Sequence, residues 1–241
     1  MSSQEVIKKR NKLFFSFIAV VIIFLTAMIL VAIYVDDYND MTLINIIIVI
    51  ALMVISLFFR NILFGYNNMA RIAKVVLSQG NPIKFTYNIV ENPDVLLNDG
   101  FSIHANNSSY SIYYKIVVDN SLKIKNIRLL YLVLILKKPQ LDFYNKNLHE
   151  DIQKLESTFQ KKSRPTKYII TAFKEVHNIS DTTIKEIGEV VSYSQKRQSF
   201  NQINVGLYNE DHKAYFLYSE KYNPSYYYKL GIDFIKKIIT K

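Results

Sequence analysis

The sequence predicts an α+β protein: an N-terminal two-helix transmembrane hairpin, followed by one cytoplasmic mixed α/β domain with an antiparallel sheet. Three observations predict this fold class. Two long apolar runs without charge stand near the start of the chain, at residues 13–35 and 42–59. Short alternating apolar segments separated by turn residues follow them, a pattern typical of β-strands. Amphipathic segments with helical spacing then alternate with further strands.

Both apolar runs are long enough to cross a bilayer, because a spanning helix needs about 20 mostly apolar residues. The second run ends at Arg60, and it extends to about residue 64 if this side chain reaches the lipid headgroups. A secretory signal peptide is the alternative for the first run, but its apolar segment would be shorter and would end in a small-residue cleavage site. We therefore expect an anchor at residues 1–65, with spans at about 13–35 and 42–64.

The charges that flank the spans predict their direction. The segment between them, residues 36–41, contains three acids and no base. Basic flanks stay in the cytoplasm, so we expect both termini inside and this segment outside. Lysine, asparagine, isoleucine and tyrosine are abundant, and their A/T-rich codons suggest a bacterial genome of low GC content. We therefore expect the membrane to be a bacterial plasma membrane. The basic residues expected at its inner surface are Lys8, Lys9, Arg10, Lys12, Arg60, Arg71 and Lys74.

The spans are expected to anchor the chain rather than conduct. Pores and transporters usually carry ionisable groups or helix breaks at depth, whereas the polar positions here are only Ser16, Thr26, Asn45 and Ser56. An oligomeric pore is the alternative, because two helices per subunit line a channel when several subunits assemble.

An amphipathic connector is predicted at residues 66–82. Its apolar residues from Met69 to Leu77 repeat at helical spacing, and Gly80-Asn81-Pro82 ends the pattern. The connector either lies along the membrane surface or packs on the domain that follows, which we expect at residues 83–241.

The first half of this domain is predicted to be β-rich. Strands are expected at residues 83–90, 101–105 and 109–119, with a turn at Asn98-Asp99-Gly100. Residues 122–136 begin as an alternation and become continuously apolar from residue 127. This run is too short to span a bilayer, so it predicts a strand that is buried on both faces.

The second half alternates between helices and strands. We predict a helix at 146–161, with Asn147 and Glu150 as a capping pair, and a strand at 167–176. A capping-box match of Thr183 and Glu186 either starts a helix or lies within one, and we expect this helix to reach about residue 197. A hairpin of residues 202–208 and 213–219 precedes a final helix that begins near residues 223–225.

No catalytic motif is visible. The chain has no cysteine, which excludes thiol nucleophiles, disulfides and thiolate metal sites. The four histidines lack partners at metal-ligand spacing, and the six glycines form neither a phosphate loop nor a dinucleotide fingerprint. We therefore expect no catalytic residue, no metal and no cofactor, and a protein that is not an enzyme.

Positive charge and tyrosine mark the candidate binding surface. The net charge is +10, and basic patches favour an anionic membrane surface, a nucleotide or an acidic partner. Tyrosines favour interfaces. The alternatives are a solvated basic surface and tyrosines that pack the core. The candidate ligand or partner residues are Lys123, Lys125, Arg128, Lys137, Lys138, Tyr215, Tyr218 and Tyr222.

These observations predict a membrane protein whose cytoplasmic domain binds without catalysis, as an accessory, regulatory or immunity subunit. The alternative is a ligand-gated effector that senses an anionic small molecule or nucleotide and permeabilises the membrane. In plan, this alternative is similar to two-span, strand-rich effectors of bacterial anti-phage signalling, although no motif matches residue by residue. The expected partners are the lipid bilayer, another membrane protein or a second copy, and a small anionic ligand. Nucleic acid is not expected, because no recognised binding motif is present.

Overall fold

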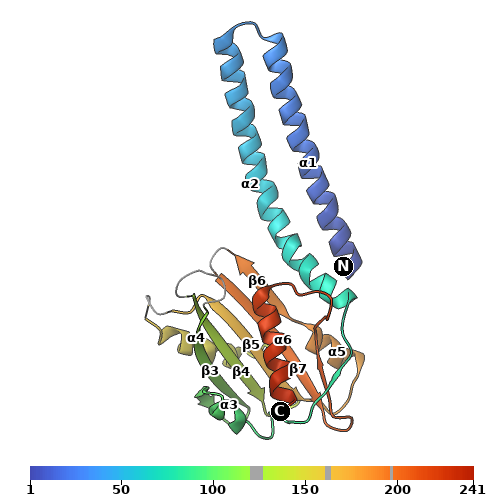
Figure 1. Cartoon of the computed structure of the whole chain (residues 1–241), viewed down its shortest axis with the longest axis vertical. Coiled ribbons are helices and arrows are strands. Elements are labelled where there is room, and N and C mark those ends of the chain that lie inside the picture. Colours follow the sequence, from blue (N-terminus) through green and yellow to red (C-terminus); the bar gives the residue numbers. More distant parts are fainter. Residues whose placement is uncertain (120–126, 161–163, 196–197) are drawn as a thin grey trace. The chain divides into compact units, whose positions relative to one another are not determined.

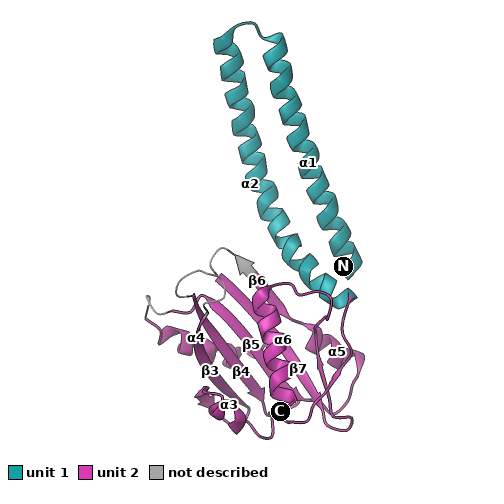
Figure 2. Cartoon of the chain, viewed as in Figure 1, with its two compact units in different colours: residues 1–77 teal, residues 78–241 magenta. Residues whose placement is uncertain are grey.

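The computed structural model of the chain describes residues 1–119, 127–160, 164–195 and 198–241 (Figure 1). It divides into two compact units, Met1–Leu77 and Ser78–Lys241 (Figure 2). The first unit is a pair of long helices, and the second is a sheet with helices on both faces. The predicted α+β class is therefore confirmed, with two long apolar helices first and a mixed-sheet domain after them.

The first unit contains α1 (Ser3–Tyr34) and α2 (Tyr38–Leu77). Ser2 and Glu5 form a capping box at the start of α1, and the Asp37 carboxylate accepts hydrogen bonds from the Asn39 and Asp40 amides at the start of α2. The helices pack side by side, with the rings of Phe17 and Phe59 5.4 Å apart.

Both helices are long and apolar enough, by length and composition, to cross a membrane. No residue of their most apolar stretches is buried. A helix that is apolar all round needs an apolar environment, and lipid would supply one. α2 continues without a break through the first part of the predicted connector and ends at Leu77.

The second unit is built on an eight-stranded sheet of order β1-β8-β7-β5-β4-β3-β2, with β6 beside β7. The strands are β1 (Ile83–Lys84), β2 (Ser102–Asn106), β3 (Tyr110–Asp119), β4 (Ile127–Leu136), β5 (Lys167–Glu175), β6 (Val191–Gln195), β7 (Gln198–Tyr208) and β8 (Lys213–Phe216). The helices are α3 (Asp94–Asn98), α4 (Lys146–Ser157), α5 (Asp181–Gly188) and α6 (Tyr226–Ile239).

The sheet is mixed, so the prediction of an antiparallel sheet is wrong at its centre. β4, β5 and β7 run parallel to one another, and every other pair is antiparallel. Parallel neighbours need a long crossover, usually a helix, and α4 and α5 lie in the two crossovers. The continuous apolar run of β4 is the sequence signal for such a strand, because helices cover both of its faces.

Alternate residues of the central strands face two helical layers. Leu130, Leu132 and Leu134 belong to a buried core with α4 and α5, whereas Leu129 packs with Ile169 and with α6. α4 and α5 therefore cover one face of the sheet and α6 the other (Figure 1).

Several predicted elements are confirmed, among them the hairpins β2–β3 and β7–β8, the strands β4 and β5, and the final helix. The strand predicted at 83–90 shrinks to β1, because the amides of Thr86 and Tyr87 donate to the Ile239 carbonyl at the end of α6 and not to a neighbouring strand. The Asn88 side chain then accepts a hydrogen bond from the Val90 amide in a turn. The helix predicted to reach residue 197 ends at Gly188, where β-branched and aromatic residues form β6 instead.

The helix caps are resolved by the structure. Asn145, not Asn147, caps α4, which ends at Ser157. Of the two alternatives for Thr183 and Glu186, the second is correct: both lie within α5, which is capped by Ser180 through a hydrogen bond from the Thr183 amide to the Ser180 hydroxyl.

Candidate functional site

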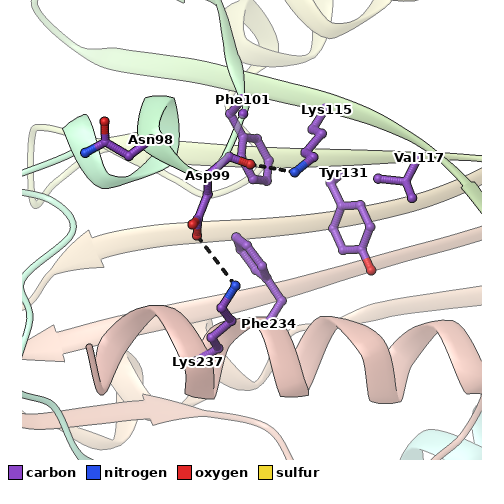
Figure 3. A pocket seen from close by; sticks show the side chains of 9 residues that line it. Asn98, Asp99, Phe101, Lys115, Val117, Tyr131, Phe234 and Lys237 are labelled. Carbon is purple, nitrogen blue, oxygen red and sulfur yellow. Dashed lines mark hydrogen bonds and ion pairs between the residues drawn. The ribbon is translucent and has the colours of Figure 1, made fainter.

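A pocket of about 490 Å³ lies on the α6 face of the sheet, beside the helix and over β3 and β4 (Figure 3). Its lining comes from the turn after α3, from β3 and β4, and from the second half of α6. The lining residues are Asn98, Asp99, Gly100, Phe101, Lys115, Val117, Tyr131, Phe234 and Lys237.

Strand register and helix spacing place these side chains together. Lys115 pairs with Tyr131 in the β3–β4 ladder, and Val117 lies two residues along β3, so all three project from the same face. Phe234 and Lys237 are three residues apart on α6, which puts them on one side of the helix.

Gly100 shapes the turn that carries Asp99 into the pocket. Its φ of +82° lies in the left-handed region, which glycine adopts without the steric cost of a Cβ atom. A Cβ atom here would make only ordinary van der Waals contact with the Lys115 ammonium nitrogen, at 3.4 Å, so the backbone conformation is what favours glycine. The predicted Asn98-Asp99-Gly100 turn is thus present, and its first residue is the last residue of α3.

Three aromatic rings form an apolar wall. The Phe234 ring lies 5.7 Å from the Phe101 ring and 5.8 Å from the Tyr131 ring, centroid to centroid. Figure 3 shows the three rings gathered beside the charged groups. An apolar or planar ligand group would find dispersion contacts on these rings.

Lysines gather around one carboxylate at the side of the pocket. The Asp99 carboxylate lies 3.0 Å from Lys241 Nζ and 3.8 Å from Lys237 Nζ, and Lys115 Nζ donates to the Asp99 carbonyl oxygen at 2.5 Å. The hydrogen bond from Lys241, followed by the charge of Lys237, holds the pKa of Asp99 below its ordinary value of 3.8. Three ammonium groups against one carboxylate leave a surplus of positive charge.

The described residues of the predicted basic surface do not come together. Arg128 lies near the start of β4 and Lys137 directly after its end, about 30 Å apart at the rise of a strand. The Lys137 ammonium donates to Asn106 and to the Asn107 carbonyl. Lys138 is exposed in the following turn, and the predicted residues Lys123 and Lys125 lie outside the described part of the chain.

The three predicted tyrosines also lie away from the pocket. Tyr215 packs against the core beneath α4 and α5, and Tyr222 is half-buried between β8 and α6. Tyr218 is 5% exposed, and its hydroxyl donates to the Asn81 carbonyl at 2.6 Å. Tyr218 thus fixes the start of the domain.

In the first unit, the predicted membrane-facing basic residues are exposed except Arg10, which is half-buried. Lys9 Nζ lies 5.1 Å from the centre of the Tyr66 ring, so the start of α1 lies beside the C-terminal part of α2. Most of the basic residues therefore lie at one end of the hairpin, with the acidic segment 36–40 at the other (Figure 1).

A second polar cluster lies at the carboxyl ends of the parallel strands, where open α/β sheets commonly bind ligands. Here Asn88, Glu175 and Asn209 hydrogen-bond one another. Both crossover helices lie on the same face, so the strand order does not open a crevice between them. Among the residues that the structure describes, no group of three or more His, Asp or Glu could hold a metal ion.

No protein-family model, no curated protein and no solved structure matches this chain. The pocket itself offers binding chemistry: ammonium groups for an anion beside a wall of rings for an apolar body. The sequence patterns did not single out the lining residues Lys115, Phe234 and Lys237. Only Lys115 has a local signal, because it interrupts the apolar residues of β3.

Proposed function

We propose that this chain is a two-span membrane protein without enzymatic activity, whose C-terminal domain binds a small anionic ligand and acts as a regulatory subunit at the inner face of a bacterial membrane. The pocket between α6 and β3 carries this proposal, because cationic and aromatic side chains converge there. Small-molecule sites are typically concave, mostly apolar and supplied with a few polar groups. The two apolar helices supply the anchor.

Ligand binding is tested by calorimetric titration of the full chain, in a non-ionic detergent, with 1-naphthyl phosphate. This probe joins a flat apolar ring system to a phosphate. We expect saturable binding that weakens about two- to twelvefold in Phe234→Ala, which removes an aromatic contact worth about 0.5–1.5 kcal/mol, and that also weakens in Lys237→Ala.

Two matched probes and one matched variant serve as controls. Inorganic phosphate lacks the rings and 1-naphthol lacks the charge, so each should bind more weakly than 1-naphthyl phosphate. Lys138→Ala removes an exposed lysine outside the pocket and should bind like the parent. Equal losses in Lys138→Ala and Lys237→Ala would indicate nonspecific attraction and would contradict the proposed site.

We also propose that both termini are cytoplasmic, on the strength of the charge difference between the two ends of the hairpin. The absence of cysteine makes single-cysteine labelling unambiguous. A membrane-impermeant maleimide should label Asp37→Cys in intact spheroplasts and should label Lys138→Cys only after permeabilisation. The reverse pattern would overturn the orientation.

Membrane permeabilisation is the second candidate, and one observation in the first unit favours it. A groove of about 340 Å³ runs along α2 past Asn45, whose side-chain oxygen has no hydrogen-bond partner among the described residues. Polar side chains in membrane helices promote helix–helix association. Overexpression that depolarises cells, with relief by Asn45→Leu, would favour an assembled pore, and unchanged potential would favour a plain anchor.

A further inference from the structure

Asp99 occupies the position in the pocket that an anionic ligand would need. Its carboxylate accepts hydrogen bonds at 3.0 Å from Lys241 through both oxygens, and the Lys237 ammonium lies 3.8 Å away. The chain thus fills its own cation cluster with a carboxylate from the turn after α3 (Figure 3). The third ammonium, that of Lys115, is held by the Asp99 backbone carbonyl and not by the carboxylate.

This internal occupancy is weak enough to be exchanged. The side chains of Lys237 and Lys241 are 66% and 32% exposed, and that of Asp99 is 24% exposed. Ion pairs with this much water contact usually contribute little, about 0.2–1 kcal/mol. A phosphate carries more charge and more acceptor oxygens than a carboxylate, so it competes well for the same lysines.

The ring wall adds a second contribution that Asp99 does not use. Phe101, Tyr131 and Phe234 line the pocket beside the lysines, and the short Asp99 side chain ends at the ammonium groups. A ligand with an apolar body next to its anionic group engages both features at once. A free inorganic anion engages only the lysines.

We infer that Asp99 is a built-in competitor, and that the ligand is an amphipathic anion whose phosphate or carboxylate group displaces the Asp99 carboxylate from Lys237 and Lys241 while its apolar part packs on Phe101 and Phe234. This inference rests on the proposed ligand-binding function and names the ligand class. The same chemistry belongs to a free aryl or alkyl phosphate and to the headgroup of an anionic lipid.

The test compares Asp99→Asn with Asp94→Asn in the full chain, using calorimetric titration with 1-naphthyl phosphate. Both variants remove one negative charge from the same short segment, but Asp94 is exposed and is not a lining residue of the pocket. Asp99→Asn should bind more tightly, by about 1.4- to fivefold, the factor that corresponds to one exposed ion pair. Asp94→Asn should bind like the parent chain.

Each outcome separates this inference from the proposed function. If no variant binds 1-naphthyl phosphate, the proposed function itself fails. If the parent binds and Asp99→Asn binds equally or more weakly, or if Asp94→Asn tightens to the same degree, the competitor role of Asp99 is overturned while the binding function stands. Near-ultraviolet circular dichroism checks that Asp99→Asn and a second variant, Asp99→Ser, fold like the parent. Asp99→Ser should also bind 1-naphthyl phosphate more tightly than the parent.

Competition then distinguishes the two sources of ligand. Phenyl phosphate and dihexanoyl phosphatidic acid are each used to displace bound 1-naphthyl phosphate from the parent and from Asp99→Asn. Displacement by both compounds supports an amphipathic anion in general, and stronger displacement by the lipid identifies a headgroup site. Displacement by inorganic phosphate as effective as that by either compound would contradict the role of the ring wall.

Discussion

Single residues decide how close the layers of the second unit come together. Gly231 of α6 faces the sheet, where an added Cβ atom would lie 2.8 Å from the Ile203 side chain and 3.2 Å from that of Ile169. Both isoleucines are fully buried, so neither can move into solvent. The position of α6, and with it one wall of the pocket, therefore depends on a residue without a side chain.

We predict that Gly231→Ala destabilises the domain. Overpacking costs about 1–3 kcal/mol, which exceeds the gain of about 0.5–1 kcal/mol from Ala over Gly within a helix. Gly188→Ala is the matched control, because nothing lies within 4 Å of its added Cβ atom. Thermal unfolding of the full chain in detergent, followed by tyrosine near-ultraviolet circular dichroism, should show a lower midpoint for Gly231→Ala only.

Asp99 gives a prediction for the effect of pH on stability. Its pKa in the folded chain lies below 3.8 because Lys241 and Lys237 favour the charged form. The ion pairs of Asp99 therefore stabilise the fold fully above pH 3.8, and this stabilisation is lost as the pH falls through the pKa of the folded chain. The midpoint of the parent should exceed that of Asp99→Asn at pH 6, and the difference should shrink at pH 3. A difference that grows on acidification would contradict this assignment.

At the scale of elements, Lys174 joins β5 to its neighbours on the α5 side. Its ammonium group, on a side chain that is 4% exposed, lies 2.6 Å from the Glu186 carboxylate and 4.5 Å from the centre of the Phe143 ring. It also donates to the Leu141 carbonyl at 3.2 Å. One buried cation thus holds β5, α5 and the loop after β4 together.

The two halves of this ion pair should differ in their cost of removal. Glu186→Ala leaves a buried ammonium without its anion and should lower the free energy of unfolding by about 3 kcal/mol. Lys174→Met keeps an apolar stem of similar length, and the Glu186 carboxylate, which is 35% exposed, remains hydrated. This variant should therefore lower the free energy of unfolding by less than about 1.5 kcal/mol. Urea unfolding of the full chain measures both, and the reverse ranking would refute this description of the pair.

Local sequence patterns predicted those elements whose signals are themselves local. The apolar run of β4, the turn residues of the two hairpins and the spacing of the final helix are all visible over a few residues. The parallel centre was missed because strand direction depends on how α4 and α5 cross the sheet. The pocket was missed because Lys115 and Phe234 meet only after β3 and α6 are both in place.

For the whole molecule, the division at Leu77 and Ser78 separates the two long apolar helices from the unit that contains the pocket. Every lining residue of the pocket, together with the lysine partners of Asp99, belongs to Ser78–Lys241. Ser78–Lys241 also has its own core on both faces of the sheet. The pocket is therefore formed entirely by residues outside α1 and α2.

We therefore predict that a chain of residues 78–241 folds and binds 1-naphthyl phosphate within about twofold of the full chain. Calorimetric titration and circular dichroism measure both properties on the same sample. A folded unit that fails to bind, beside a full chain that binds, would show that the helices contribute to the site.

One labelling measurement tests the central claim, that an anchored domain on the inner side of the membrane binds an anion in this pocket. Val117 lines the pocket, and Val117→Cys would be the only thiol in the chain. A membrane-impermeant maleimide should leave it unlabelled in intact spheroplasts and label it after permeabilisation, with protection by 1-naphthyl phosphate but not by 1-naphthol. Labelling in intact spheroplasts, or labelling that 1-naphthyl phosphate does not slow, would contradict the account.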